Sequence, residues 1–431
     1  MSKEENRKNF SKYVSQNILG MIGFSCYVLA DSYFISIAKG ADGLTALNLV
    51  MPLYSIIFSI GEMIGVGSAI RYAISKIKKD ADADDYFWNA LIWCILSSMI
   101  FVFAGIFFSA DIMRVLGADE HIVAVGNNYT KIFMCFAPMF MCNYVTNAFV
   151  RNDGAPGIAM SATLFSSLFN IVFDYILMFP MNLGMEGAAL ATALSPIIGM
   201  GICSIHFFSK KSSVRLVVCK PSVRKLVAGC QLGVSAFVGE MSSAVITLAF
   251  NFVILKLAGN VGVAAYGVVA NIAIVTTAVF NGVAQGSQPL ISSCFGRGDK
   301  DGCTQLKRMG YTTAFVLAAV MYSILFIFAG QFVAVFNSEG SEMLRLYATE
   351  GVKLYFIGIF FAGINIVGGG AFSATEDAFK AAVVSVARGF VLILGAVFVM
   401  SAFFGMTGVW LAYAVAEGIT TFIMLVMAMR V

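Results

Sequence analysis

Five acidic side chains lie inside long apolar stretches of this sequence: Asp31, Glu62, Asp174, Glu240 and Glu417. A charged group at the centre of a membrane helix costs about 2.5–3.5 kcal/mol on insertion scales, so such residues are functional candidates by default. The comparable basic residues, Lys353 and Arg388, lie nearer to the ends of their apolar stretches. This acidic set favours a pathway for cations or protons over one for anions.

Two of these acids have a polar neighbour one helical turn away. Asn170 precedes Asp174, and Tyr27 precedes Asp31, by a spacing that puts each pair on one face of a helix. Carboxylate, amide and phenol oxygens can share a proton or complete the oxygen shell of a hard cation such as Na+. We therefore predict an H+ or Na+ site here. The alternative interpretation is that each Asp only ties two helices together through hydrogen bonds.

Glu62 lies in the segment 61–67, which is rich in glycine. Small residues let membrane helices approach closely, so Glu62 either faces a water-filled cleft or is tolerated by packing. The chain has 23 methionines and 39 phenylalanines, which would give a cleft an adaptable apolar wall. Because aromatic faces attract organic cations, flat amphipathic cations are the expected ligands.

A membrane must surround these side chains. Of the 431 residues, 59% are hydrophobic and 12% are charged, whereas soluble proteins have about 25% charged residues. Apolar runs such as 88–109 and 311–336 are much longer than the roughly ten residues of a transmembrane strand. Helices satisfy their own backbone hydrogen bonds in lipid. We predict an all-α polytopic membrane protein with twelve transmembrane helices.

Lysine and arginine gather at the N-terminus and in alternate loops, chiefly 76–79, 210–225 and 297–308. The positive-inside rule then places both termini in the cytoplasm. Topology accounts for these basic residues, so no nucleic-acid partner is expected. The nine cysteines are scattered without a C-x-x-C pair or metal-ligand spacing, and no cofactor or metal is expected beyond H+ or Na+.

The chain contains an internal repeat. Sliding the sequence so that Gly40 meets Gly259 aligns the turn residues at both ends of the second and eighth predicted spans. The segment 184–191 matches 405–412 at nearly the same offset. Two matches at similar offsets indicate duplication.

The basic connector between the sixth and seventh spans is the natural boundary of the repeat. We predict an N-lobe of residues 1–212 with helices one to six, and a C-lobe of residues 213–431 with helices seven to twelve. Each half has an even number of spans, so both halves enter the membrane from the same side. A pseudo-two-fold axis along the membrane normal should relate the two six-helix bundles, an architecture suited to alternating access.

Ordered motifs along the whole chain resemble the multidrug and toxic compound extrusion (MATE) family of cation-coupled exporters. These motifs are residues 31–35 with Gly40 and Pro52, residues 151–154 with Pro156, Asn170 and Asp174 with Gly184 and 187–192, and 282–290 with Gly296. The resemblance implies an antiporter that exports amphipathic, cationic organic compounds in exchange for H+ or Na+. It further implies a monomeric multi-pass protein of the bacterial cytoplasmic membrane that is not an enzyme.

The resemblance also assigns the coupling site. Asp31 and Asp174 match the acids that bind the coupling ion in members with an N-lobe site. Asn170 and Thr192 match their polar helpers, and Tyr27 matches a nearby tyrosine.

A C-lobe site is represented only in part. Glu240 resembles the acid on helix seven of members that use that lobe, yet 354–372 contains no acid and offers Asn365 instead. The N-lobe site is therefore the better assignment, and Glu240, Glu62 and Asn365 are expected to line the substrate cavity or form a secondary acidic site. A second departure is the absence of proline from 13–30, which puts bending of helix one in doubt.

Three other functions fit the sequence less well. A lipid-linked saccharide flippase of the related superfamily would have a basic central cavity, against which the acidic set argues. A membrane-embedded enzyme finds no support, because only His121 and His206 are present and neither an H-E-x-x-H motif nor a nucleophile elbow occurs. For an ion channel, no filter-like repeat is visible.

Overall fold

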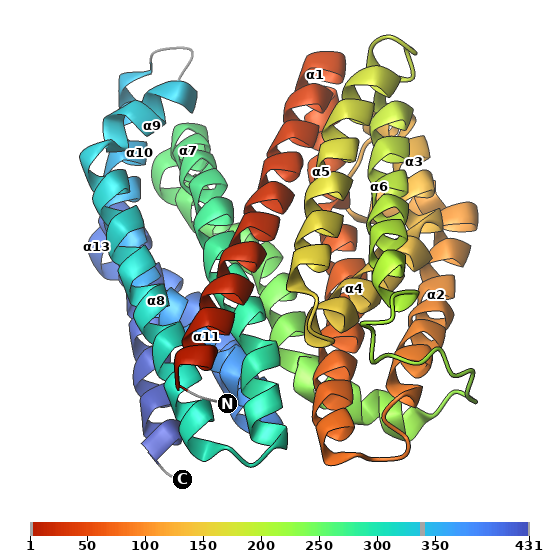
Figure 1. Cartoon of the computed structure of the whole chain (residues 1–431). Helices are drawn as coiled ribbons and strands as arrows, with labels where there is room; N and C mark the ends of the chain where they lie inside the picture. Colours follow the sequence, from red (N-terminus) through yellow and green to blue (C-terminus); the bar gives the residue numbers. More distant parts are fainter. Residues whose placement is uncertain (1–2, 337–340, 430–431) are drawn as a thin grey trace.

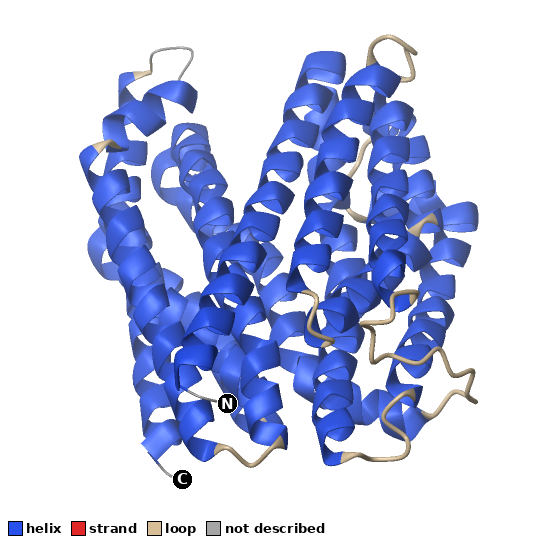
Figure 2. Ribbon diagram, in the orientation of Figure 1, coloured by secondary structure: helices blue, strands red, loops and turns tan. Residues whose placement is uncertain are grey.

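The computed structural model describes residues 3–336 and 341–429, and this part of the chain consists of helices joined by loops, with a longer connector at 208–222 (Figure 2). The first six helices are α1 (Lys3–Lys78), α2 (Asp85–Val115), α3 (Glu120–Cys135), α4 (Ala137–Asn152), α5 (Pro156–Met178) and α6 (Gly184–Phe207). The remainder are α7 (Val223–Gly296), α8 (Lys300–Ile327), α9 (Ala329–Phe336), α10 (Glu342–Tyr355), η1 (Phe356–Gly358), α11 (Ile359–Ala374), α12 (Ala378–Val386), η2 (Ala387–Val391) and α13 (Leu392–Met429).

These helices amount to twelve spans within the described residues. Nine helical segments are long and apolar enough to cross a membrane, and α3 with α4 forms a tenth span that is bent by 46°. Two of the nine, Val223–Gly296 and Ala378–Ala428, contain two spans each, because the backbone breaks at Gly259 and Gly405. The predicted all-α fold with twelve membrane helices is confirmed.

Glycines with positive φ break the long helices at repeated positions. Gly40 has φ 58° and ψ −142°, and Gly259 has φ 62° and ψ −157°. Gly184 and Gly405, which open the second matched segment of each half, also have positive φ, 52° and 57°. Only glycine adopts such conformations readily. The paired glycines are thus repeated in backbone geometry as well as in sequence.

The helices form two bundles, α1–α6 and α7–α13, whose ribbons diverge away from the end that carries both termini (Figure 1). We call these bundles the N-lobe and the C-lobe. They meet closely at the end of the termini, where an added Cβ on Gly67 would overlap the carbonyl oxygen of Gly229. An added Cβ on Gly286 would come within 2.7 Å of the Cα of Val14. Small residues therefore let the lobes pack backbone to backbone at this end.

Charged side chains join the lobes at the same end. The guanidinium of Arg71 and the ammonium of Lys78, both on α1, pair with the carboxylate of Glu376 in the turn between α11 and α12. Arg71 also donates from Nε to the carbonyl oxygen of Ala228 at 3.1 Å. These contacts complete the closed end of the molecule.

The connector between α6 and α7 is anchored on Asp153, which follows α4. Its carboxylate accepts from Ser212 Oγ at 3.1 Å and from the backbone N–H of Ser213 at 2.8 Å, and it contacts His206 Nε2 at 2.8 Å. The boundary that we propose between residues 212 and 213 falls in this anchored connector.

Candidate ion and substrate site

Asp31 and Asp174 lie inside the N-lobe on facing helices. Asp31 is on the first half of α1 and 7% exposed, and Asp174 is on α5 and fully buried. The two helices pack together, with the rings of Phe34 and Tyr175 6.3 Å apart, and the two carboxyl groups are close enough for electrostatic interaction. In the described part of the chain, each carboxyl group has one buried oxygen, Oδ1, with no hydrogen-bond partner.

Asn170 connects this pair of acids to α6. In the amide orientation that satisfies its neighbours, its nitrogen donates to Asp174 Oδ2 at 3.2 Å and its oxygen accepts from Thr192 Oγ1 at 3.1 Å. Both residues are buried. The one-turn spacing from Asn170 to Asp174 gives the contact that the sequence predicted, and Thr192 closes the group from the neighbouring helix.

Tyrosine hydroxyls surround the two acids. Tyr27, one turn before Asp31 on α1, is close enough to Asp31 and Asp174 to interact electrostatically. Tyr54 and Tyr129 hydrogen-bond to each other through their hydroxyl groups, and both are also within electrostatic reach of Asp31 and Asp174. Phenol, amide and hydroxyl groups therefore surround the two buried acids.

A cavity of about 110 Å³ opens beside this site. Its wall includes the carboxylates of Glu62 and Glu240, the guanidinium of Arg151, and the ring of Tyr27. Tyr27 also belongs to the surroundings of Asp31, so the ion site and the cavity share a side chain. Apolar and aromatic lining residues are Met21, Phe24, Phe58, Phe140, Tyr144 and Met160.

Gln285 crosses from the C-lobe into this cavity. Its amide nitrogen donates to Glu62 Oε1 at 3.3 Å, and its amide oxygen accepts from Arg151 Nη1 at 2.7 Å. Arg151 and Glu62 are both buried, so a carboxylate and a guanidinium of the N-lobe are bridged by one neutral side chain of the C-lobe. The floor of the cavity thus depends on both lobes.

The structure brings most of the predicted site residues together, in two adjacent groups. One group consists of Asp31, Asp174, Asn170 and Thr192. The other consists of Glu62 and Glu240, which line the cavity. Tyr27 lies next to the first group and also lines the cavity. Asn365 is elsewhere: it is buried within the C-lobe and hydrogen-bonds to Glu417 at 2.6 Å.

Sequence reasoning missed four polar residues of the site: Tyr54, Tyr129, Arg151 and Gln285. The last two occur in the segments 151–154 and 282–290, which carried the family resemblance. That resemblance was the only available signal for them.

The two groups suit different tasks. Paired carboxyl groups with unpartnered oxygens, next to amide and hydroxyl oxygens, can hold a proton or a small hard cation. A carboxylate-bearing cavity with aromatic and methionine walls can hold an amphipathic organic cation. Among the described residues, no group of three or more His, Cys, Asp or Glu side chains could hold a metal ion, and the polar set differs from a transition-metal centre.

Comparison with known proteins agrees with this architecture. The model of the MatE family matches residues 17–176 and 236–399. The multidrug export protein MepA of Staphylococcus aureus (strain MRSA252) is 27% identical over 414 residues, which cover 93% of this chain and 89% of that protein. MepA of Staphylococcus saprophyticus is 26% identical over 405 residues, with the same coverage.

Solved structures show the same fold. A multidrug resistance MATE family transporter in an outward-facing conformation has a TM-score of 0.92 at 20% identity and covers 99% of this chain and 96% of its own. A transporter of the MOP superfamily from Pyrococcus furiosus, described as having a binding pocket of reverse polarity, has a TM-score of 0.91 at 20% identity with the same coverage.

Proposed function

This chain belongs to the MATE family, whose members are transporters and not enzymes, and we propose that it is an antiporter that exports amphipathic organic cations in exchange for H+ or Na+. The coupling ion would bind at Asp31 and Asp174, with Asn170, Thr192 and Tyr27 as its polar surroundings. The exported compound would bind in the adjoining cavity.

One observation carries the coupling-ion proposal: two buried carboxyl groups lie close to each other, and each has an oxygen without a partner among the described residues. Burying such groups is costly unless a proton or a cation compensates the charge. A site of this kind takes up its ion when it is accessible from one side and releases it on the other.

The proposed substrate class rests on the cavity. Glu62 and Glu240 would compensate a positive charge, while the aromatic and methionine side chains would contact flat apolar groups of varied shape. Two curated relatives are named multidrug export proteins, which supports the same class for this chain.

Alternating access requires two arrangements of the lobes. The basic residues favour cytoplasmic termini, so the described arrangement, with the lobes in contact at the terminal end, would be closed to the cytoplasm of a bacterium. Ion binding between α1 and α5 would favour one arrangement and substrate the other, each only by its difference in affinity for the two states. One monomer contains both lobes and would suffice for the cycle.

The first test is efflux of a cationic dye such as ethidium from proteoliposomes, with an inward H+ gradient and an inward Na+ gradient imposed separately. We expect one gradient to drive efflux by the wild-type protein. Asp31→Asn and Asp174→Asn, which keep the shape but remove the charge, should reduce gradient-driven efflux to the level of empty vesicles.

Asp111→Asn is the matched control, because Asp111 is exposed at the end of α2 and pairs only locally with Arg114. It should retain wild-type efflux. If both site variants show wild-type efflux with equal amounts of protein in the vesicles, the assignment of the ion site is wrong. If dye efflux is independent of both ion gradients in the wild type and in all variants, the protein is not an antiporter.

A further inference from the structure

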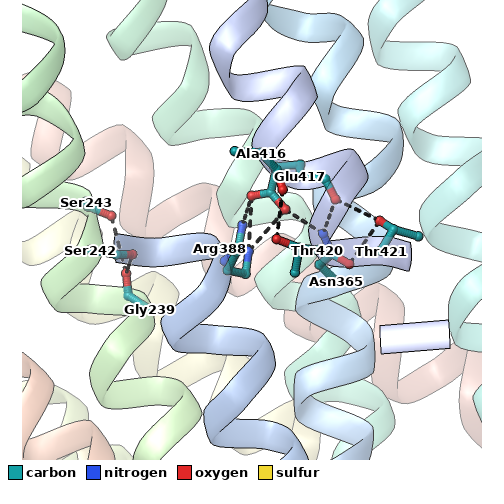
Figure 3. Close-up of polar contacts among 9 residues, drawn as sticks. All are labelled: Gly239, Ser242, Ser243, Asn365, Arg388, Ala416, Glu417, Thr420 and Thr421. Carbon is teal, nitrogen blue, oxygen red and sulfur yellow. Dashed lines mark hydrogen bonds and ion pairs between the residues drawn. The ribbon is translucent and has the colours of Figure 1, made fainter. Parts of the chain in front are cut away.

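The C-lobe contains a buried polar cluster that the proposed transport site does not use (Figure 3). Arg388, at η2, donates to Glu417 on α13, with Nη2 2.6 Å and Nε 3.1 Å from Oε1. Asn365 on α11 donates to the other carboxylate oxygen, Oε2, at 2.6 Å. The hydroxyl of Thr421 donates to Asn365 Oδ1 at 3.0 Å.

This cluster is self-contained. The Glu417 side chain is 3% exposed and that of Arg388 16%, and both carboxylate oxygens accept hydrogen bonds from within the C-lobe. An isolated buried charge would be strongly destabilising, whereas a paired and hydrogen-bonded one is tolerated. Arg388 also lies in η2, a five-residue π-helix. Such bulges in an α-helix are frequent at functional positions.

The internal repeat shows which part of the N-lobe corresponds to this cluster. The offset that pairs the start of α3, Glu120, with the start of α10, Glu342, also pairs Asn143 with Asn365 and Ser166 with Arg388. The offset that pairs Gly184 with Gly405 pairs Ser195 with Ala416 and Pro196 with Glu417.

All four N-lobe residues of these pairs, namely Asn143, Ser166, Ser195 and Pro196, line the cavity. Three of their C-lobe counterparts, Asn365, Arg388 and Glu417, are residues of the cluster, and the fourth, Ala416, directly precedes Glu417 (Figure 3). The place that is open in the N-lobe is therefore filled by a protein side chain in the C-lobe. That side chain ends in a planar organic cation.

We infer that the guanidinium of Arg388 is a tethered cation that occupies the C-lobe counterpart of the cavity wall formed by Asn143, Ser166, Ser195 and Pro196. The carboxylate of Glu417 then forms a built binding site for a guanidinium-type cation, with a negative charge and two acceptor oxygens for its N–H groups, and Asn365 holds that carboxylate by donating to Oε2. Together with the proposed function, this means that a free organic cation is exchanged at the cavity and not at the Arg388 position of the C-lobe.

The test is chemical rescue. Arg388→Ala removes the tethered cation and leaves Glu417 buried with an empty space beside it. We expect this variant to melt at a lower temperature, and methylguanidinium at millimolar concentration to raise its melting temperature by several degrees with saturation. Ligands that bind only the folded protein stabilise it in this way. Urea, a neutral molecule of the same shape, should not do so.

Two controls separate a binding site from general stabilisation. Methylguanidinium should not raise the melting temperature of the wild-type protein, because the guanidinium of Arg388 fills the site. The double variant Arg388→Ala/Glu417→Gln should fold without an uncompensated charge, and methylguanidinium should not raise its melting temperature either. If Arg388→Ala folds only when methylguanidinium is present, that dependence is the same expected result.

The inference is overturned if methylguanidinium raises the melting temperature of Arg388→Ala no more than urea does, or without saturation. It is also overturned if methylguanidinium raises the melting temperature of the double variant equally. The readout is melting temperature and not transport. Loss of dye efflux in the Asp31 and Asp174 variants and failure of rescue here are therefore independent outcomes.

Discussion

Asn170 orients the carboxyl group of Asp174. Its amide lies between Asp174 Oδ2 and Thr192 Oγ1, and all three side chains are buried. A buried neighbour that orients an ion-binding carboxylate contributes to affinity without contacting the ion itself, and loss of such a neighbour typically lowers metal affinity by about 10–100-fold.

We therefore expect Asn170→Leu, which is similar in size but has no polar atoms, to raise the ion concentration for half-maximal dye efflux by about tenfold. Thr192→Val should have a smaller effect in the same direction, because it removes only one partner of the amide. The measurement is efflux rate against the concentration of the driving ion.

Asn152→Ala is the control for that experiment, since Asn152 bonds only to the carbonyl oxygen of Ala148 at the end of α4. Its ion dependence should match the wild type. An unchanged half-maximal concentration in Asn170→Leu would mean that Asn170 does not orient Asp174 for the ion.

At this scale, charge was the most informative feature of the sequence. Asp31, Asp174 and Glu62 were identified because a carboxylate inside an apolar run is conspicuous. Arg151 and Gln285 were not, because their contact joins positions 134 residues apart. Tyr54 and Tyr129 are two of 15 tyrosines, and nothing local distinguishes them. Contacts between distant helices depend on tertiary packing, which one sequence does not specify.

Among the elements, the glycine-rich contact of α1 with α7 controls how closely the lobes approach. An added Cβ on Gly67 would overlap the carbonyl oxygen of Gly229, and the backbone of both helices would have to move apart. Inserting a methyl group into a packed interface costs about 1–3 kcal/mol. That range is sufficient to change the populations of two lobe arrangements severalfold or more.

We expect Gly67→Ala to open the contact, and Cys230, which follows Gly229, to report it. In a background that lacks the other cysteines, a thiol reagent should label Cys230 severalfold faster in Gly67→Ala than in the parent. Gly267→Ala is the matched control, because an added Cβ there meets no atom within 4 Å. Equal labelling in all three proteins would contradict a tight contact at Gly67.

The sequence predicted most elements but not their irregularities. The helices follow from the long apolar runs, and the breaks at Gly40 and Gly259 coincide with the turn residues of the repeat. The π-helix η2 at Arg388 was not predicted, because no pattern in 387–391 marks an additional backbone residue. The division of the ninth span at Phe328 was also missed, since that residue continues the apolar run.

In the whole molecule, duplication explains the similar helix arrangement of the two lobes, and divergence explains why their interiors differ. The repeated glycines and the repeated order of spans give two similar lobes, as the sequence predicted. Position 365 shows the divergence: Asn143 in the N-lobe lines an open cavity, whereas Asn365 in the C-lobe holds Glu417 in an ion pair. Whether a repeated position is open or filled depends on partners from three helices, which explains why Asn365 could not be placed from sequence.

In the transport cycle that we propose, the two arrangements of the lobes would differ at the terminal end, where Glu376 pairs with both Arg71 and Lys78. These side chains are partly exposed, and such pairs contribute about 0–1 kcal/mol. The contribution is nevertheless specific to the closed arrangement, because Glu376 belongs to the C-lobe and its two partners to α1. Separation of the lobes at this end would leave all three charges without these partners.

We expect Glu376→Gln, which leaves Arg71 and Lys78 facing each other without a counter-charge, to shift the lobes toward the reverse arrangement by up to about fivefold. Spin labels at Val115 and Leu346, exposed positions near the opposite end of the two lobes, would report this as a larger population of short distances. Asp377→Asn is the control, since the ion pair that Asp377 forms is with Lys380, within the C-lobe. If Glu376→Gln keeps the wild-type distance distribution while Gly67→Ala changes it, apolar packing and not charge holds the terminal end closed.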